Sequence, residues 1–158
     1  MGTKSATHKP YQPWIDNYPE GIDFYAPVDT TPVPEQIDAS VKKHANRVAL
    51  DFLGKETTFA ELGEAIDQMA GALQKQMGIK KGDRVALLMP NSHFFPIAYY
   101  AALKIGATIV NCNPLYTVPE LTHILKNSNC KVIITLDLAL TFDKAEALAQ
   151  DNLCEKIL

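Results

Sequence analysis

The chain has 158 residues, of which 47% are hydrophobic, so it is long and apolar enough for one ordinary domain with a buried core. Its formal net charge is −3, and positive and negative residues are interspersed along it. It therefore lacks the basic stripe that neutralises phosphates in nucleic-acid-binding proteins, and we expect no nucleic-acid partner.

The cysteines indicate a reducing, cytoplasmic setting. Cys112, Cys130 and Cys154 are an odd number and contain no C-x-x-C pair, so we expect each to be a small buried hydrophobic residue. The N-terminus has no apolar signal core, and Met1-Gly2 does not continue into a myristoylation motif. We expect neither export nor a lipid anchor.

Residues 1–33 are predicted to form an irregular N-terminal arm. Five prolines in this segment disfavour regular structure, and its aromatic residues offer surface for packing. Two interpretations remain open: the arm packs on its own domain, or it contacts a second subunit and holds a homodimer. The prolines and aromatic residues are Pro10, Tyr11, Pro13, Trp14, Tyr18, Pro19, Phe24, Tyr25, Pro27 and Pro32.

Beyond the arm, the pattern first predicts a helix over 34–44 and then a hairpin. Within residues 47–52, Val48, Leu50 and Phe52 occupy alternate positions, and Gly54 follows before a short polar strand. The next helix has the clearest signals, because Thr58 and Glu61 form a capping box and Gly78 supplies the stop.

The rest of the sequence alternates strands with helices. The run 85–103 has no Asp, Glu, Lys or Arg, but Pro90 and Pro96 interrupt it, so a strand and a buried helix explain it better than a membrane span. The predicted elements are a strand over 84–89, a helix from Asn91 and Ser92 to Gly106, a strand over 107–111, a helix over 117–126, a strand over 131–135, a helix over 141–150, and the start of a strand at 156–158.

This order predicts an α/β fold: a doubly wound, mostly parallel sheet with helices on both faces, a short antiparallel hairpin and the irregular arm. Because the sequence stops inside an apparent strand, we expect residues 34–158 to be the first, incomplete part of a larger N-terminal domain.

A candidate site lies at Asn113-Pro114-Leu115-Tyr116-Thr117, between a predicted strand and a helix. Tyr116 is the one side chain we expect to bind substrate. His93 is expected to form a local hydrogen bond, and His123 to lie on the surface or half-buried. Residues 113–117 contain no nucleophile with an adjacent base, and the sequence has no glycine-rich phosphate loop or metal-ligand spacing. We therefore expect no catalytic, cofactor-binding or metal-binding residue within residues 1–158.

Five segments of the sequence, taken in order, form a recognisable set: Thr58-Phe59-Ala60-Glu61-Leu62, Lys81-Gly82-Asp83-Arg84-Val85, Pro90-Asn91, Leu103-Lys104-Ile105-Gly106-Ala107 and Asn113-Pro114-Leu115-Tyr116-Thr117-Val118-Pro119-Glu120-Leu121. Together they resemble the start of an adenylate-forming acyl-CoA synthetase. Residues 113–117, with Trp14, Tyr18-Pro19 and Gly21 of the arm, are less widely shared and resemble bacterial long-chain fatty acid–CoA ligases in particular.

The resemblance implies an enzyme that uses ATP, Mg²⁺ and CoA to activate a long-chain fatty acid through an acyl-adenylate. The family's phosphate loop, magnesium-binding Glu, hinge acid and catalytic Lys have no match in residues 1–158, so we expect this piece alone to be inactive and to bind none of these ligands. Because long-chain acids partition into bilayers, weak peripheral contact with the cytoplasmic face of the membrane is also implied.

Two alternatives remain open at this stage. The chain is part of a ligase of the same superfamily for another carboxylic acid, or it is a noncatalytic α/β interaction module. Acid size rests on the resemblance alone, because no residue identified here lines an acyl pocket.

Overall fold

The computed structural model describes residues 12–158, and the chain divides into two compact units, Met1–Thr30 and Thr31–Leu158. Pro10 and Tyr11 of the predicted arm, like Met1 and Gly2, lie outside the described residues.

In the first unit, the described residues 12–30 contain one turn of 3₁₀ helix, η1 (Ile15–Asn17). The ring of Phe24 makes edge-to-face contacts with Tyr18 and Tyr25, with centroids 5.3 and 5.0 Å away. The Tyr25 hydroxyl donates to Gln12 Oε1 at 3.1 Å. Aromatic contacts, rather than a backbone ladder, therefore order this segment.

The second unit contains all the other helices and strands that the structure describes, and their bounds agree with the predicted ones to within a few residues. In chain order they are α1 (Val33–His44), β1 (Val48–Phe52), β2 (Lys55–Thr58), α2 (Phe59–Lys75), β3 (Arg84–Leu88), α3 (Phe94–Lys104), β4 (Thr108–Cys112), α4 (Val118–Ser128), β5 (Val132–Thr135), α5 (Ala139–Gln150) and β6 (Lys156–Ile157).

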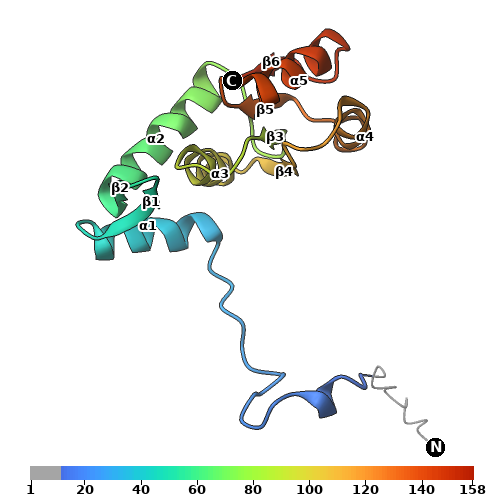
Figure 1. The fold of residues 1–158 in the computed structure, drawn as a ribbon. Coiled ribbons are helices and arrows are strands. Elements are labelled where there is room, and N and C mark those ends of the chain that lie inside the picture. The colour runs from blue at the N-terminus through green and yellow to red at the C-terminus, as the bar shows by residue number, and fades with distance from the viewer. Residues whose placement is uncertain (1–11) are drawn as a thin grey trace, which may run out of the picture. The chain divides into compact units, whose positions relative to one another are not determined.

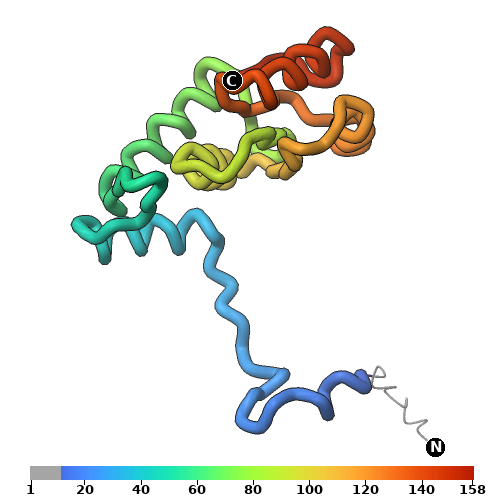
Figure 2. The backbone as a smooth tube through the Cα atoms, viewed as in Figure 1, coloured from blue at the N-terminus to red at the C-terminus, as the bar shows by residue number. Residues whose placement is uncertain are grey.

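Four strands form a parallel sheet in the order β4-β3-β5-β6, with β3 between two neighbours (Figure 1). Leu87 of β3 pairs with Asn111 of β4 and with Ile134 of β5, and both pairings are parallel. The chain crosses from β3 through α3 to β4, and then returns through α4 to β5 on the other side of β3 (Figure 2). The predicted doubly wound sheet is confirmed.

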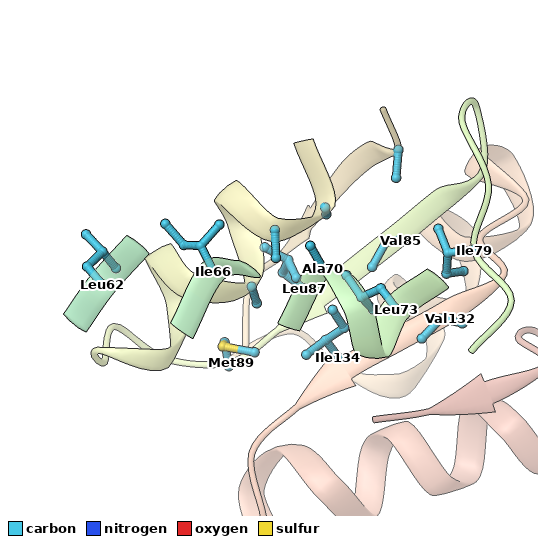
Figure 3. Close-up of a cluster of buried hydrophobic side chains, with 14 residues drawn as sticks. Leu62, Ile66, Ala70, Leu73, Ile79, Val85, Leu87, Met89, Val132 and Ile134 are labelled. Atoms are coloured by element: carbon cyan, nitrogen blue, oxygen red, sulfur yellow. The ribbon is translucent and has the colours of Figure 1, made fainter. Parts of the chain in front are cut away.

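The two faces of the sheet are covered by different helices, because alternate residues of β3 point in opposite directions. Val85 and Leu87 belong to one buried cluster with side chains of α2 and α3, whereas Ala86 and Leu88 belong to a second with side chains of α4 and α5. Figure 3 shows the first cluster, in which residues of α2 lie against β3 and β5. Burying one Leu or Val side chain fully contributes about 1.5–3 kcal/mol.

The run without charged residues, 85–103, is therefore divided between β3, a loop and α3, as predicted. Among residues 12–158, no helix combines the length and apolarity needed to cross a bilayer.

The start of α2 confirms the predicted capping box. The backbone N–H of Glu61 bonds to Thr58 Oγ1 at 3.3 Å, and the backbone N–H of Thr58 donates to Glu61 Oε2 at 2.8 Å. This backbone bond, followed by that from the Thr58 hydroxyl, holds the pKa of Glu61 below its usual value. Residues 58 and 61 thus satisfy each other's backbone donors where the helix begins.

The start of α3 differs from the prediction that Asn91 and Ser92 open the helix. The helix begins at Phe94, after a bend at 91–92, and no side chain caps it. The physical reason is Pro96, which has no N–H to donate to the carbonyl of Ser92 four residues earlier. Ser92 therefore cannot take part in a regular first helical turn.

The hairpin tip, residues 51–56, contains a two-residue turn with an unusual occupant. Leu53 and Gly54 both have positive φ, 54° and 79°, which is the left-handed conformation that such turns require. Asn, Asp or Gly normally stands at the first position, and an L-residue with a bulky side chain costs about 1–2 kcal/mol there. Leu53 is also 91% exposed, so burial within this unit does not offset that cost.

Helices α1, α2 and α3 are linked by one lysine. Lys104 at the end of α3 lies 2.8 Å from Asp38 Oδ1 of α1 and 2.7 Å from Asp67 Oδ1 of α2. The hydrogen bonds to Asp38 and then to Asp67 raise the pKa of Lys104 above its usual value. The ammonium group therefore stays charged and joins three helices that meet beside the sheet.

The close approach of α1 and α2 depends on a glycine. A methyl group at position 63 would place its carbon 2.7 Å from Val41 Cγ1, whereas one at position 71, two turns later on α2, would meet no atom within 4 Å. The same substitution at the two sites therefore separates packing from helix propensity.

We expect Gly71→Ala to stabilise the protein by up to about 1 kcal/mol, because alanine loses less backbone entropy in a helix. Gly63→Ala gains the same propensity but forces α1 away from α2, and we expect a net loss of about 1 kcal/mol. Urea unfolding curves with equal slopes would measure both. Equal stabilisation by the two alanines would show that α1 can move away from α2 without a loss of stability.

Candidate functional site

The candidate site lies at the edge of the sheet where the parallel strands end at their carboxyl termini. β3 connects to β4 on one side of the sheet and β5 connects to β6 on the other, so the loops after the neighbouring strands β3 and β5 diverge at this edge. In open α/β sheets, ligands bind outside the carboxyl ends of the strands at such a point. Thr135 Oγ1 of β5 donates to the carbonyl of Leu88 at 2.8 Å and holds the two strand ends together.

The turn at residues 113–117 follows β4 on this edge. Asn113 shapes it, because its side-chain Oδ1 accepts from the backbone N–H of Leu115 at 2.9 Å and its carbonyl accepts from Tyr116 N at 3.0 Å. An asparagine side chain that bonds two residues ahead mimics a backbone turn. The backbone N–H groups of residues 115 and 116 are therefore both hydrogen-bonded before α4 begins.

Lys144 of α5 holds the same turn from a distant part of the sequence. Its Nζ donates to the carbonyl of Pro114 at 2.7 Å and to the carbonyl of Tyr116 at 2.8 Å. Bonds from an ionised donor are stronger than neutral ones. The sequence interpretation missed this residue. The predicted helix at 141–150 does contain it, but no local motif indicates a partner 28 residues away.

Glu120 completes this arrangement at the start of α4. Its Oε2 accepts from the backbone N–H of Thr117 at 2.8 Å and from the Thr117 hydroxyl at 2.7 Å. The backbone bond and then the hydroxyl bond lower the pKa of Glu120, and the positive charge of Lys144 acts in the same direction. Glu120 is therefore an ionised structural carboxylate, already engaged at the helix terminus.

Tyr116, the predicted substrate-binding residue, is 38% exposed at one end of a groove along α4. The groove has a volume of about 510 Å³, and Pro119, His123 and Ile124 also line it. His123 is exposed, as expected for a surface histidine. The hydroxyl of Tyr116 can donate and accept a hydrogen bond. Its role in substrate binding stays a prediction.

A second hollow, of about 440 Å³, lies between β1 and the loop after β3. Residues 49–52 and 91–93 line it with Phe95 and Pro96. Ser92 Oγ and His93 Nδ1 are buried beside it and have no hydrogen-bond partner among residues 12–158.

The prediction that His93 forms a local hydrogen bond is therefore wrong for its Nδ1 atom. The backbone of His93 already has helical φ and ψ of −64° and −20°, rather than the extended values that bring a cap side chain back to the first turn. Its ring lies instead against the rings of Phe94 and Phe52, with centroids 3.9 and 5.9 Å away.

Cys112, the last residue of β4, directly precedes the turn. Burial, with a smaller effect from Cys130, raises the pKa of the Cys112 thiol to about 11. The thiol is therefore neutral near pH 7 and is a poor nucleophile. Among residues 12–158, no group of three or more His, Cys, Asp or Glu side chains is arranged to hold a metal ion.

A family model described as AMP-binding enzyme matches residues 37–157, which is most of the chain. The chain belongs to the AMP-binding enzyme family. The resemblance inferred from the sequence motifs is thus confirmed at the level of the family.

The relatives refine this assignment. The chain is 35% identical over 147 residues to a long-chain-fatty-acid–CoA ligase of Bacillus subtilis (strain 168), covering 93% of this chain and 26% of the relative. It is 36% identical over 137 residues to the enzyme of the same name from Escherichia coli O6:H1, covering 83% and 24%. The chain thus spans about a quarter of the length of these curated relatives.

Among solved structures, the anthranilate CoA ligase AuaEII in complex with anthranoyl-AMP has a TM-score of 0.72 and 26% identity. The match covers 78% of this chain and 24% of that one. It supports the parallel sheet with helices on both faces as the start of an adenylate-forming fold.

We expect Lys144→Met to loosen the turn at 113–117, because the substitution keeps the apolar stem and removes both charge-assisted hydrogen bonds. Hydrogen exchange of the Leu115 and Tyr116 amides should accelerate on the order of ten-fold, which corresponds to about 1.4 kcal/mol of lost local stability. Lys126→Met, at an exposed site on α4, is the matched control. Unchanged exchange in Lys144→Met would show that Asn113 alone orders the turn.

We expect alkylation of Cys112 by iodoacetamide to be slow in the folded protein and to accelerate with each pH unit up to about pH 11, since the reactive thiolate forms only as pH approaches the raised pKa. Peptide mapping by mass spectrometry at several pH values would measure the rate. The urea-unfolded chain is the control, and its alkylation rate should level off at a pH just above the ordinary cysteine pKa of about 8.5. A plateau near that value in the folded protein would contradict the burial argument.

Proposed function

We propose that this chain forms the first part of an AMP-forming ligase that joins a long-chain fatty acid to CoA. The observation that carries the proposal is the 35% identity to the Bacillus subtilis long-chain-fatty-acid–CoA ligase, which extends over 93% of the chain. Family membership over residues 37–157 and the parallel-sheet fold support it.

The proposed reaction has two steps. The fatty acid carboxylate attacks the α-phosphorus of ATP, so that an acyl-adenylate forms and pyrophosphate leaves. The sulfur of CoA then attacks the acyl carbon, and AMP leaves as the thioester forms and the thiol proton is released. Both steps require stabilisation of charge on phosphate oxygens.

Residues 12–158 supply scaffold for these steps rather than the charged groups themselves. Lys144 and Glu120 face the candidate turn, but both are engaged in holding it. We therefore propose that the groups acting on phosphate belong to other parts of the whole enzyme, and that residues 1–158 alone are inactive. Tyr116, at the end of the α4 groove, is the proposed substrate contact in this region.

Further details of the proposal rest on the family resemblance. Magnesium is proposed as a cofactor of the whole enzyme; the side chains of residues 12–158 do not fit a magnesium site, so its ligands would lie elsewhere in the protein. Weak peripheral contact with the membrane is proposed on the same basis. A cytoplasmic location is proposed from the three cysteines, and a homodimer contact through the N-terminal arm from its aromatic residues.

A second candidate function is a ligase of the same family for an aromatic acid. It is favoured by the structural match to the anthranilate CoA ligase, although the identity in that match is 26%, compared with 35% for the fatty acid ligase. The two candidates differ in the shape of the acid, and a substrate series separates them.

We expect pyrophosphate release by the intact enzyme to increase with the chain length of the fatty acid. Each buried methylene contributes about 0.8 kcal/mol, so kcat/KM should rise about four-fold per methylene until the acyl pocket is filled. A continuous coupled assay with a graded series of fatty acids would measure this. Benzoate and anthranilate serve as comparison acids, and a preference for either would contradict the fatty acid proposal.

A further inference from the structure

Lys144 connects two parts of the chain that follow different strands of the sheet. It lies on α5, after β5, whereas the turn at 113–117 follows β4, and β3 lies between these two strands. Its Nζ donates to the carbonyls of Pro114 and Tyr116 at 2.7 and 2.8 Å. Within the turn, the carbonyl of Asn113 accepts from Tyr116 N at 3.0 Å. The backbone of Tyr116 is therefore held both from inside the turn and from α5.

The surroundings of this bridge are exposed and apolar. The Tyr116 side chain lies at one end of the α4 groove, and Leu115 beside it is 75% exposed. On α5, Leu140 is 53% exposed and stands four residues before Lys144, which places both on one side of the helix. Exposed apolar side chains therefore flank the bridge on both elements. Such a surface, with one hydroxyl, suits the apolar body of a carboxylic acid better than a phosphate group.

The charge of Lys144 is largely committed within the protein. Two of the three N–H donors of its ammonium group bond to carbonyls, and the side chain is half-buried. Glu120 lies near enough for the positive charge of Lys144 to help lower the pKa of that carboxyl group. A ligand at this edge would therefore be affected by where Lys144 holds the turn, rather than by a free positive charge.

We propose that Lys144 is a positioning residue for the acid substrate. Its two hydrogen bonds fix the backbone at 114–116 and so hold the Tyr116 side chain against the apolar part of the acid. This inference rests on the proposed ligase function. Lys144 itself contacts neither the acid nor phosphate. Because the contact of Tyr116 with the acid is the same before and during the reaction, its loss raises the KM for the acid and leaves kcat unchanged.

The test follows pyrophosphate release by the intact enzyme with palmitate, at saturating ATP and CoA. We expect Lys144→Met to raise the KM for palmitate about ten-fold at unchanged kcat, since hydrogen bonds from a charged donor contribute enough for a change of this size. Lys144→Arg keeps the charge and several N–H donors and should recover most of the loss. Lys126→Met, at an exposed site on α4, should leave both constants unchanged.

A double-mutant cycle separates positioning from general stabilisation. Tyr116→Ala removes the ring but keeps the carbonyl that Lys144 binds. We expect Tyr116→Ala alone to raise the KM for palmitate, and the addition of Lys144→Met to raise it no further, because the second change then acts on a side chain that is absent. A purely structural role of Lys144 would instead give the same effect in both backgrounds.

Several results would overturn the proposal. One is an unchanged KM for palmitate in Lys144→Met or in Tyr116→Ala, and another is a full effect of Lys144→Met in the Tyr116→Ala background. A fall in kcat, or a raised KM for ATP, would mean that Lys144 acts on phosphate rather than through Tyr116. The proposed function fails separately, if the wild type prefers benzoate to palmitate, and the same cycle is then measured with benzoate.

Discussion

Burial of β3 on both faces is the constraint on which the rest of this structure depends. The four residues from Val85 to Leu88 are each at most 1% exposed, and the strand pairs with β4 on one side and β5 on the other. A strand in this position has no polar face, so its alternate side chains require an apolar helix pair on each side. The placement of α2 and α3 opposite α4 and α5 follows from this requirement.

Much of this arrangement could be predicted from local patterns in the sequence. The capping pairs Thr58–Glu61 and Thr117–Glu120 identify the starts of α2 and α4, because the bonds that form them connect residues three apart. The continuous apolar run of β3 indicates a strand covered on both faces. The alternation of strands and helices then leaves a parallel, doubly wound sheet as the natural solution.

Other features could not be predicted, because tertiary contacts decide them. Lys144 bonds carbonyls 28 and 30 residues away, and only the packing of α5 beside α4 brings it there. Among residues 12–158, Nδ1 of His93 has no hydrogen-bond partner, and the ring contacts those of Phe52 and Phe94. The turn at Leu53 follows from the hairpin pattern, but its strain becomes evident only from φ.

The candidate turn and the hairpin tip show two ways in which this chain uses its loops. The turn at 113–117 has its donors satisfied and a lysine fixed across it, which gives a rigid edge suited to positioning a ligand. The hairpin tip has the opposite character, because Leu53 has a positive φ and an exposed side chain. The contacts within this unit therefore fix the turn at the sheet edge more completely than the hairpin tip.

The strand order has a consequence for the growing polypeptide on the ribosome. Residue 85 of β3 pairs with residue 132 of β5, so the central strand is made long before its second neighbour exists. Until residue 135 has left the exit tunnel, one edge of this apolar strand lacks its neighbour, and non-local pairing of this kind forms slowly. Nascent chains of intermediate length should therefore depend most on chaperones that shield bare strands.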